Sequence, residues 1–199
     1  LVPAAIVQIL LQREARVART QHFDEQAMHV LHLVGQQQGG VIEAAKQMLS
    51  AIAAHDAVRA LRPGAACDAF LADIVAANPR YLAASVVDGQ GSHVCAVPAV
   101  ARGFDIADRP YFQRTMRDTS FQLGAFAIGR ATGRRSLHFA APVRDEAGQP
   151  IGLVLLALSL DWLAAELQSL PLPAGGTATI ADRDGIILAH APDPGRFVG

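Results

Sequence analysis

The chain has 199 residues, of which 51% are hydrophobic and 18% are charged, and its 17 basic residues nearly balance its 18 acidic ones. A chain this apolar, with a net charge of −1, is not intrinsically disordered and has no electrostatic bias toward nucleic acid. We therefore predict a folded protein without a nucleic-acid partner. Its length suits one sizeable core, or one core with a smaller second lobe.

The N-terminal part has a helical pattern. Over residues 12–61, apolar residues recur at spacings of three, four or seven, which places them along one side of a helix. We predict a stalk helix within residues 1–62 that Gly39 and Gly40 weaken or bend, because an interior glycine costs about 1 kcal/mol relative to alanine. The apolar stripe suggests a homodimer formed through this helix, although the same stripe could pack on the chain's own lobe.

The first residues, from Leu1 to Leu11, include no charged side chain. A transmembrane helix needs about 20 apolar residues, so this stretch alone is too short to cross a bilayer. Two interpretations stay open: the outer end of a longer membrane span, or the ordinary start of a helix.

After residue 63 the pattern alternates between helices and extended segments. A helix is expected from Cys67 to Ala77, where Asn78 and Pro79 end it, and another over Asp161–Leu167. The expected strands, separated by glycine turns, are Tyr81–Asp88, Ser92–Val97, Phe121–Gly129, Arg134–Arg144, Ile151–Leu160, Thr177–Ala181 and Ile186–His190. The fold class is therefore α+β with a central antiparallel sheet.

A short helix is expected in the middle of the chain. Asp108 is a good N-cap residue, and Pro110 fits the first helical turn, where its missing N–H loses no partner. This helix should end near Asp118.

The C-terminal part begins with a proline- and glycine-rich segment over residues 171–176, which is expected to be a linker. The residues after it are too few to bury a core of their own, since an independent domain takes at least about 50 residues. We therefore divide the chain into a stalk (1–62), a lobe (63–170) and the start of a second lobe (171–199).

Several short motifs occur in a characteristic order. They are Asp108-Arg109-Pro110-Tyr111-Phe112, Thr132-Gly133-Arg134, Ala141-Pro142-Val143-Arg144-Asp145 with Gly148 and Gly152, Leu160-Asp161-Trp162-Leu163, and Ala181-Asp182-Arg183-Asp184-Gly185. Together with the order of elements, they resemble the double Cache family of extracytoplasmic sensor domains in bacterial transmembrane receptors. The resemblance implies a membrane-distal PAS-like lobe after the stalk helix, the beginning of a membrane-proximal PAS-like lobe, and no cofactor.

The resemblance also implies a small-molecule site between the sheet and the short helix. Arg109 matches the arginine that binds a ligand carboxylate in amino-acid-binding members. The other matching positions hold Tyr111 and Phe112 in place of two aromatics, Phe126 in place of a tyrosine, and Ile128 and Ala157 in place of two acidic residues. Without those acids a buried ammonium group would lack a charge partner, so we expect a small organic acid or another polar metabolite rather than an α-amino acid.

The residues themselves allow both ligand-binding and structural roles. The planar guanidinium of Arg109 fits a carboxylate, but it could instead pair with Asp105 or Asp108. His138 should share its strand face with alternating residues and could contact a ligand or be a satisfied structural residue. The aromatic residues are as typical of a core as of a binding site.

One candidate metal site stands apart from these residues. His22, Glu25, His29 and His32 lie on one face of the predicted stalk helix. A polar stripe on a solvated helix gives the same spacing, so we predict no metal. No standard catalytic or nucleotide-binding signature is present in the sequence.

The two cysteines leave the redox compartment open. Cys67 and Cys95 could form a disulfide in an oxidising periplasm. Nothing in their spacing forces them together, so two buried free thiols are the expected state.

The preferred interpretation is a non-catalytic, periplasmic sensor domain of a bacterial inner-membrane receptor, most typically a sensor histidine kinase. Diguanylate cyclases and chemoreceptors carry similar sensors and stay open as outputs. Two other classes compete with it: a soluble α+β enzyme that uses the same cleft, and a cytoplasmic PAS module that holds haem or flavin.

Overall fold

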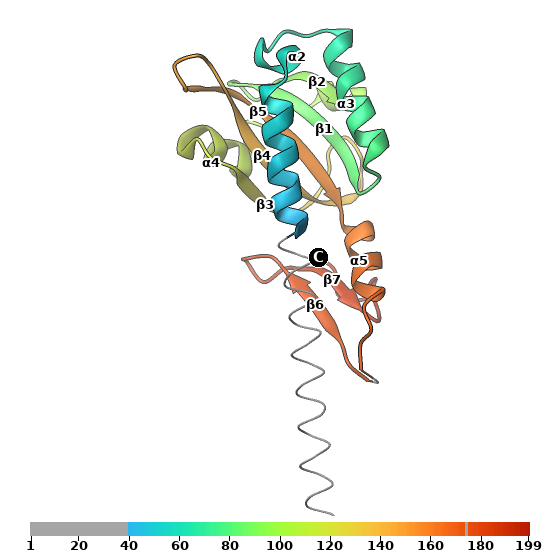
Figure 1. The fold of residues 1–199 in the computed structure, drawn as a ribbon. Coiled ribbons are helices and arrows are strands. Elements are labelled where there is room, and N and C mark those ends of the chain that lie inside the picture. The colour runs from blue at the N-terminus through green and yellow to red at the C-terminus, as the bar shows by residue number, and fades with distance from the viewer. Residues whose placement is uncertain (1–39, 174) are drawn as a thin grey trace, which may run out of the picture.

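The structure is a computed structural model that describes residues 40–173 and 175–199. Its main feature is a five-stranded antiparallel sheet with the strand order β2-β1-β5-β4-β3 (Figure 1). The strands are β1 (Tyr81–Asp88), β2 (His93–Val97), β3 (Gln122–Ile128), β4 (Arg135–Arg144) and β5 (Pro150–Ser159). The predicted α+β class with a central antiparallel sheet is confirmed.

Side chains of β4 and β5 alternate between two buried faces of the sheet. Phe139 and Leu156 lie on one face, and Ala140 and Leu155 lie on the other. Since each face is covered by helix or loop, β5 is almost continuously apolar rather than alternating between apolar and polar residues.

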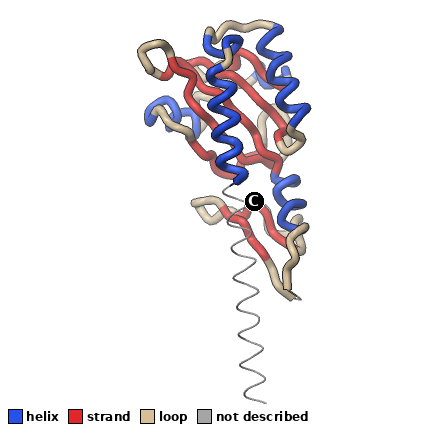
Figure 2. The backbone as a smooth tube through the Cα atoms, viewed as in Figure 1, coloured by secondary structure: helices blue, strands red, loops and turns tan. Residues whose placement is uncertain are grey.

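Two helices cover the first face: the helix over residues 40–54 and α3 (Ala65–Ala77) (Figure 2). The second face is covered by α4 (Pro110–Asp118) together with the loop that precedes it. A 3-10 helix, η1 (Ala99–Gly103), follows β2.

The N-terminal helix is shorter at its C-terminal end than predicted. It stops at residue 54, and α2 (Asp56–Arg59) follows after His55. The backbone of His55 is extended, and its Nδ1 accepts a hydrogen bond from the Ala57 N–H at 3.2 Å, so this residue caps α2 instead of continuing the first helix.

The apolar stripe of the stalk faces the chain's own sheet over residues 40–54. Ala45, Leu49 and Ile52 are fully buried in the first-face core. The alternative of packing on the chain's own lobe therefore holds for this segment. The rest of the stripe, the uncharged N-terminal run and the His22 cluster lie outside the described residues, and dimerisation stays a prediction. Within the described part of the chain, no helix is long and apolar enough to cross a membrane.

Helix α4 begins at Pro110 and ends at Asp118, as predicted, but Asp108 is not its N-cap. Arg109 occupies that position and makes no capping hydrogen bond with its side chain. The carboxylate of Asp108 is instead bound by Arg130, because a bidentate ion pair with a guanidinium outcompetes a bond to a backbone N–H.

A second, two-stranded sheet follows the main one. It is formed by β6 (Ala178–Ala181) and β7 (Ile187–Ala191), and β7 packs against α5 (Leu160–Gln168). Leu188 and Ala189 belong to the same apolar cluster as the first-face core, so this hairpin buries its side chains against the main lobe. The division of the chain at residues 62 and 170 stays a prediction.

Cys67 and Cys95 form a disulfide, and the expected pair of free thiols is wrong. Helix α3 packs on β2 and brings the two Cα atoms to 6.0 Å from each other. Asp68 strengthens the same contact, because its carboxylate accepts a hydrogen bond from the Ala96 N–H at 3.1 Å and pairs with Arg102.

The disulfide should contribute strongly to stability. It joins residues 28 positions apart, and closing a loop of that length in the unfolded chain corresponds to roughly 3 to 4 kcal/mol. We expect reductant to lower the free energy of unfolding by about that amount in urea titrations. The double variant Cys67→Ala, Cys95→Ala should unfold at the same urea concentration with and without reductant; an equal response to reductant in both proteins would contradict the assignment.

Candidate functional site

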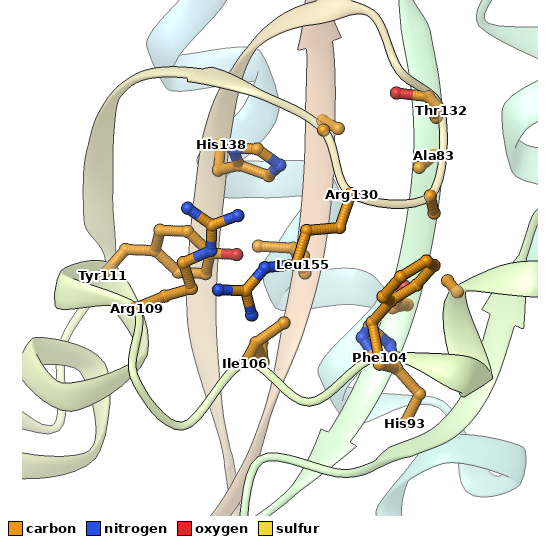
Figure 3. A pocket seen from close by; sticks show the side chains of 15 residues that line it. Ala83, His93, Phe104, Ile106, Arg109, Tyr111, Arg130, Thr132, His138 and Leu155 are labelled. Carbon is orange, nitrogen blue, oxygen red and sulfur yellow. The ribbon is translucent and has the colours of Figure 1, made fainter.

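The second face of the sheet is hollowed between η1, the loop that leads to α4, and the loop over residues 129–133 (Figure 3). The hollow contains about 500 Å³ free of atoms, part of which is open to solvent, and about 50 Å³ is accessible to the centres of water-sized groups. Its polar lining residues are Ser85, His93, Arg109, Tyr111, Arg130, Thr132 and His138, and its apolar lining residues are Ala83, Ala101, Phe104, Ile106, Ala131, Leu155 and Ala157, with Gly129. No carboxylate is among these lining residues, so the hollow is electropositive.

Arg109, at the end of the loop before α4, contributes a guanidinium to the lining of the hollow. Figure 3 shows its guanidinium beside the side chains of Tyr111 and His138. The Arg109 side chain is half-buried and has no hydrogen bond or ion pair with any residue that the structure describes. The structure does not show the alternative pairing with Asp105 or Asp108.

Tyr111 and His138 form the wall next to Arg109. Their rings are stacked, with centroids 5.1 Å apart and planes 15° from parallel. Gly124 on β3 backs this stack: a Cβ atom there would lie 3.3 Å from Tyr111 Cδ1 and 3.1 Å from the His138 carbonyl oxygen. A glycine at this position lets both rings approach the sheet.

Burial sets the protonation of both rings. It lowers the pKa of His138 from 6.5 to about 4, helped by the positive charge of Arg109, so the imidazole is neutral at neutral pH. The buried Nδ1 of His138 has no hydrogen-bond partner. Burial also raises the pKa of Tyr111 to about 12, so its hydroxyl stays protonated and can donate a hydrogen bond.

His93 lies toward the other end of the hollow, near Phe104 (Figure 3). Burial lowers its pKa, an effect that the charges of Asp105 and Asp88 partly offset. Its Nδ1 is also buried without a partner. The hollow therefore combines one unpaired guanidinium, one phenolic donor and two imidazoles with unused hydrogen-bonding capacity, a set of groups that suits an anion with further polar atoms.

The structure brings four of the predicted site residues to the hollow: Arg109, Tyr111, His138 and Ala157. Ala157 pairs directly with His138 across β4 and β5. Phe112 does not line the hollow and is buried with the apolar residues beneath α4.

Phe126 and Ile128 also lie outside the hollow. Strand β3 has an irregularity between Leu123 and Phe126 that places Phe126 opposite Leu137. Since one extra residue in a strand moves the following side chains to the other face, Phe126 packs at the first-face core rather than beside Tyr111. Ile128, at the end of the strand, is 60% exposed.

Among the lining residues that the sequence did not single out are His93, Phe104 and Arg130. His93 and Phe104 come from segments with no motif of their own. The sequence could not identify Arg130 as a site residue, because nearly all basic residues in this chain are arginines and no single one is distinctive. Thr132 also lines the hollow; the sequence placed it in a motif but not among the site residues.

Comparison with protein families decides what kind of domain this is. A model of the Cache domain matches residues 12–198, nearly the whole chain. The chain belongs to the Cache domain family. The resemblance inferred from the motifs is confirmed, and the sensor class replaces the competing soluble-enzyme interpretation, because Cache domains are ligand-binding receptor domains.

Solved structures share the fold of this Cache domain at low sequence identity. The extracellular ligand binding receptor from Desulfohalobium retbaense has 18% identity and a TM-score of 0.71, with 85% of this chain and 31% of that chain covered. The ligand-binding domain of the Pseudomonas fluorescens chemoreceptor CtaA with L-isoleucine has 23% identity and a TM-score of 0.62, covering 94% of this chain and 74% of that one. The sensor domain of the V. cholerae histidine kinase DctB has 15% identity and a TM-score of 0.56, covering 90% and 68%.

This Cache domain covers about a third of the length of the Desulfohalobium retbaense receptor chain. A comparison with curated protein sequences finds no match.

The buried imidazole of His138 predicts a pH-dependent stability. Its pKa is about 4 in the folded Cache domain and near 6.5 in an unfolded chain, so between these pH values the unfolded chain binds a proton that the folded domain does not. The free energy of unfolding should fall by roughly 3 kcal/mol as the pH decreases from 6.5 to 4. Burial also lowers the pKa of His93, which adds a pH dependence of the same sign to the free energy of unfolding.

Urea unfolding at several pH values measures this dependence. The variant His138→Asn should lose less stability than the wild type over the same interval. Parallel curves for the two proteins would show that His138 titrates normally.

Proposed function

We propose that this Cache domain is the extracytoplasmic sensor of a bacterial membrane receptor and that it binds a small organic acid in the hollow on the second face of the sheet. The observation that carries the proposal is the unpaired guanidinium of Arg109 in a hollow that no carboxylate lines. A carboxylate ligand would supply the missing partner through two parallel hydrogen bonds.

The hollow favours an acid over an α-amino acid. CtaA is solved with L-isoleucine and the Pseudomonas aeruginosa chemoreceptor PctC with GABA, and both ligands carry an amino group as well as a carboxylate. In the hollow of this chain Ala157 offers no partner for an ammonium group, and an unpaired ammonium ion is costly to bury.

The ligand is proposed to be small. The space accessible to water-sized groups, about 50 Å³, accommodates roughly three to five such groups. Acetate would match this volume, and a larger acid such as pyruvate or lactate would extend through the open side. Tyr111 would donate to the ligand, and the neutral ring of His138 would offer a further hydrogen bond.

Signal transfer is proposed to run through the sheet. Strands β4 and β5 carry the hollow on one face and contact the helix over residues 40–54 on the other. A ligand that prefers one position of these strands would shift the helix, and through it a membrane anchor and an N-terminal homodimer, by no more than its differential affinity allows. We propose a histidine kinase as output, with a chemoreceptor as the second candidate, because sensors of both share this fold.

Anion binding should depend on Arg109. We expect acetate, pyruvate, lactate or succinate to raise the thermal midpoint of the wild type, because saturation at a hundredfold excess over the Kd contributes about 2.7 kcal/mol. Arg109→Ala should weaken binding by tenfold to a hundredfold, since it removes hydrogen bonds to a charged group. Thermal-shift titrations measure both effects.

Arg117→Ala is the matched control, because Arg117 is an exposed arginine on the same helix that pairs only with its neighbour Asp118. It should bind the acids like the wild type. Equal losses in both variants, or no stabilisation of the wild type by any of the acids, would refute the proposed site.

A further inference from the structure

We infer that Arg130 is a positioning residue: it binds the Asp108 carboxylate next to Arg109 and thereby keeps the Arg109 guanidinium available for the ligand. The inference rests on the proposed anion site but concerns a residue that no family motif assigns. It follows from how three groups at the mouth of the hollow share their hydrogen bonds.

Arg130 binds two acceptors of the loop before α4, the Asp108 carboxylate and the Asp105 carbonyl oxygen. Its Nη2 lies 2.6 Å from Asp108 Oδ2 and its Nη1 lies 3.0 Å from Oδ1, so the ion pair is bidentate. The same Nη1 lies 2.6 Å from the carbonyl oxygen of Asp105. These contacts fix both carboxylate oxygens of Asp108 in the direction of Arg130.

Asp108 precedes Arg109 directly in the chain, which makes its carboxylate an obvious competitor for that guanidinium. The hydrogen bond from Arg130, reinforced by the charge of Arg109, holds the pKa of Asp108 below its usual range, so this group is ionised at neutral pH. If Arg130 were absent, Asp108 and the ligand would compete for the same donor. A positive charge supplied from the loop after β3 thus decides which anion Arg109 binds.

The Arg130–Asp108 pair is not needed to hold the fold. The side chains of Arg130 and Asp108 are 37% and 62% exposed, and exposed pairs add little to stability. A change in ligand affinity after removal of Arg130 would therefore come from rearranged charges rather than from unfolding. If Asp108 captured Arg109 in about nine molecules out of ten, the apparent affinity for an anion would fall about tenfold.

The test is a cycle of Arg130→Ala, Asp108→Asn and their combination, titrated with acetate and with pyruvate. We expect Arg130→Ala to bind about tenfold more weakly than the wild type, and Asp108→Asn to stay within about twofold. The combined variant should recover wild-type affinity, because Asp108 can no longer capture Arg109 and the Asp105 carboxylate is held by the Ala107 N–H. A merely structural role of Arg130 predicts no such rescue.

Two outcomes would overturn the inference: wild-type affinity in Arg130→Ala, or a combined variant as weak as Arg130→Ala, which would place Arg130 in direct contact with the ligand. The pair Arg117→Ala and Asp118→Asn is the matched control, since it removes another exposed ion pair from the same lobe. It should leave both affinities unchanged.

A second readout needs no ligand. The side-chain N–H signal of Arg109 in a ¹⁵N NMR spectrum, identified by its absence in Arg109→Lys, should shift in Arg130→Ala and return to its original position in the combined variant. If no acid binds the wild type, the proposed function fails, while this signal still decides between a free and a captured Arg109. An unchanged signal in Arg130→Ala would overturn the inference.

Discussion

The alternation of side chains along β4 and β5 is the constraint on which the rest of the structure depends. It sends Phe139 and Leu156 to one face and their neighbours His138 and Ala157 to the other. The first face carries an apolar core that two helices cover. The second face is hollowed, and polar side chains form part of its lining. A slip by one residue would exchange Phe139 and His138, which would bury an imidazole in the core and fill the hollow with a phenyl ring. Register and binding chemistry are therefore fixed together.

Pairing among charges then determines which cation stays available. Around the hollow, Arg130 binds Asp108, while Arg134 and Arg135 both bind Asp161 at the start of α5, at 3.0 and 3.1 Å. The loop between β3 and β4 is held by ion pairs on both sides of its turn. Against this background, the unpaired guanidinium of Arg109 is informative, since Arg130, Arg134 and Arg135 all have acidic partners.

Local signals in the sequence were enough for most of the fold. Strand alternation and glycine turns are short-range properties, so β1 to β5 lie where the pattern places them. Asp108 shows where such signals fail: its local preference is to cap α4, but the contact with Arg130, from a distant segment, takes precedence. The disulfide between Cys67 and Cys95 likewise depends on how α3 docks on β2, which no spacing reveals.

The candidate site was predictable in part, and mainly through the resemblance. Arg109, Tyr111, His138 and Ala157 line the hollow, whereas Phe126 is displaced by an irregularity in β3. Gly124 within that strand was a sequence signal for such an irregularity, since glycine in a strand often marks a bulge or a close approach. Residues such as His93 lacked any comparable signal.

The disulfide also makes the chain convenient for spectroscopy. Both of its cysteines are in the bridge, so no native thiol is free to react. A cysteine introduced at exposed Ser50 on the outer side of the first helix, together with one at Arg183 in the turn between β6 and β7, would form a unique pair of labelling sites. Distances between probes at these two positions would report directly how the main lobe and the second sheet move relative to each other.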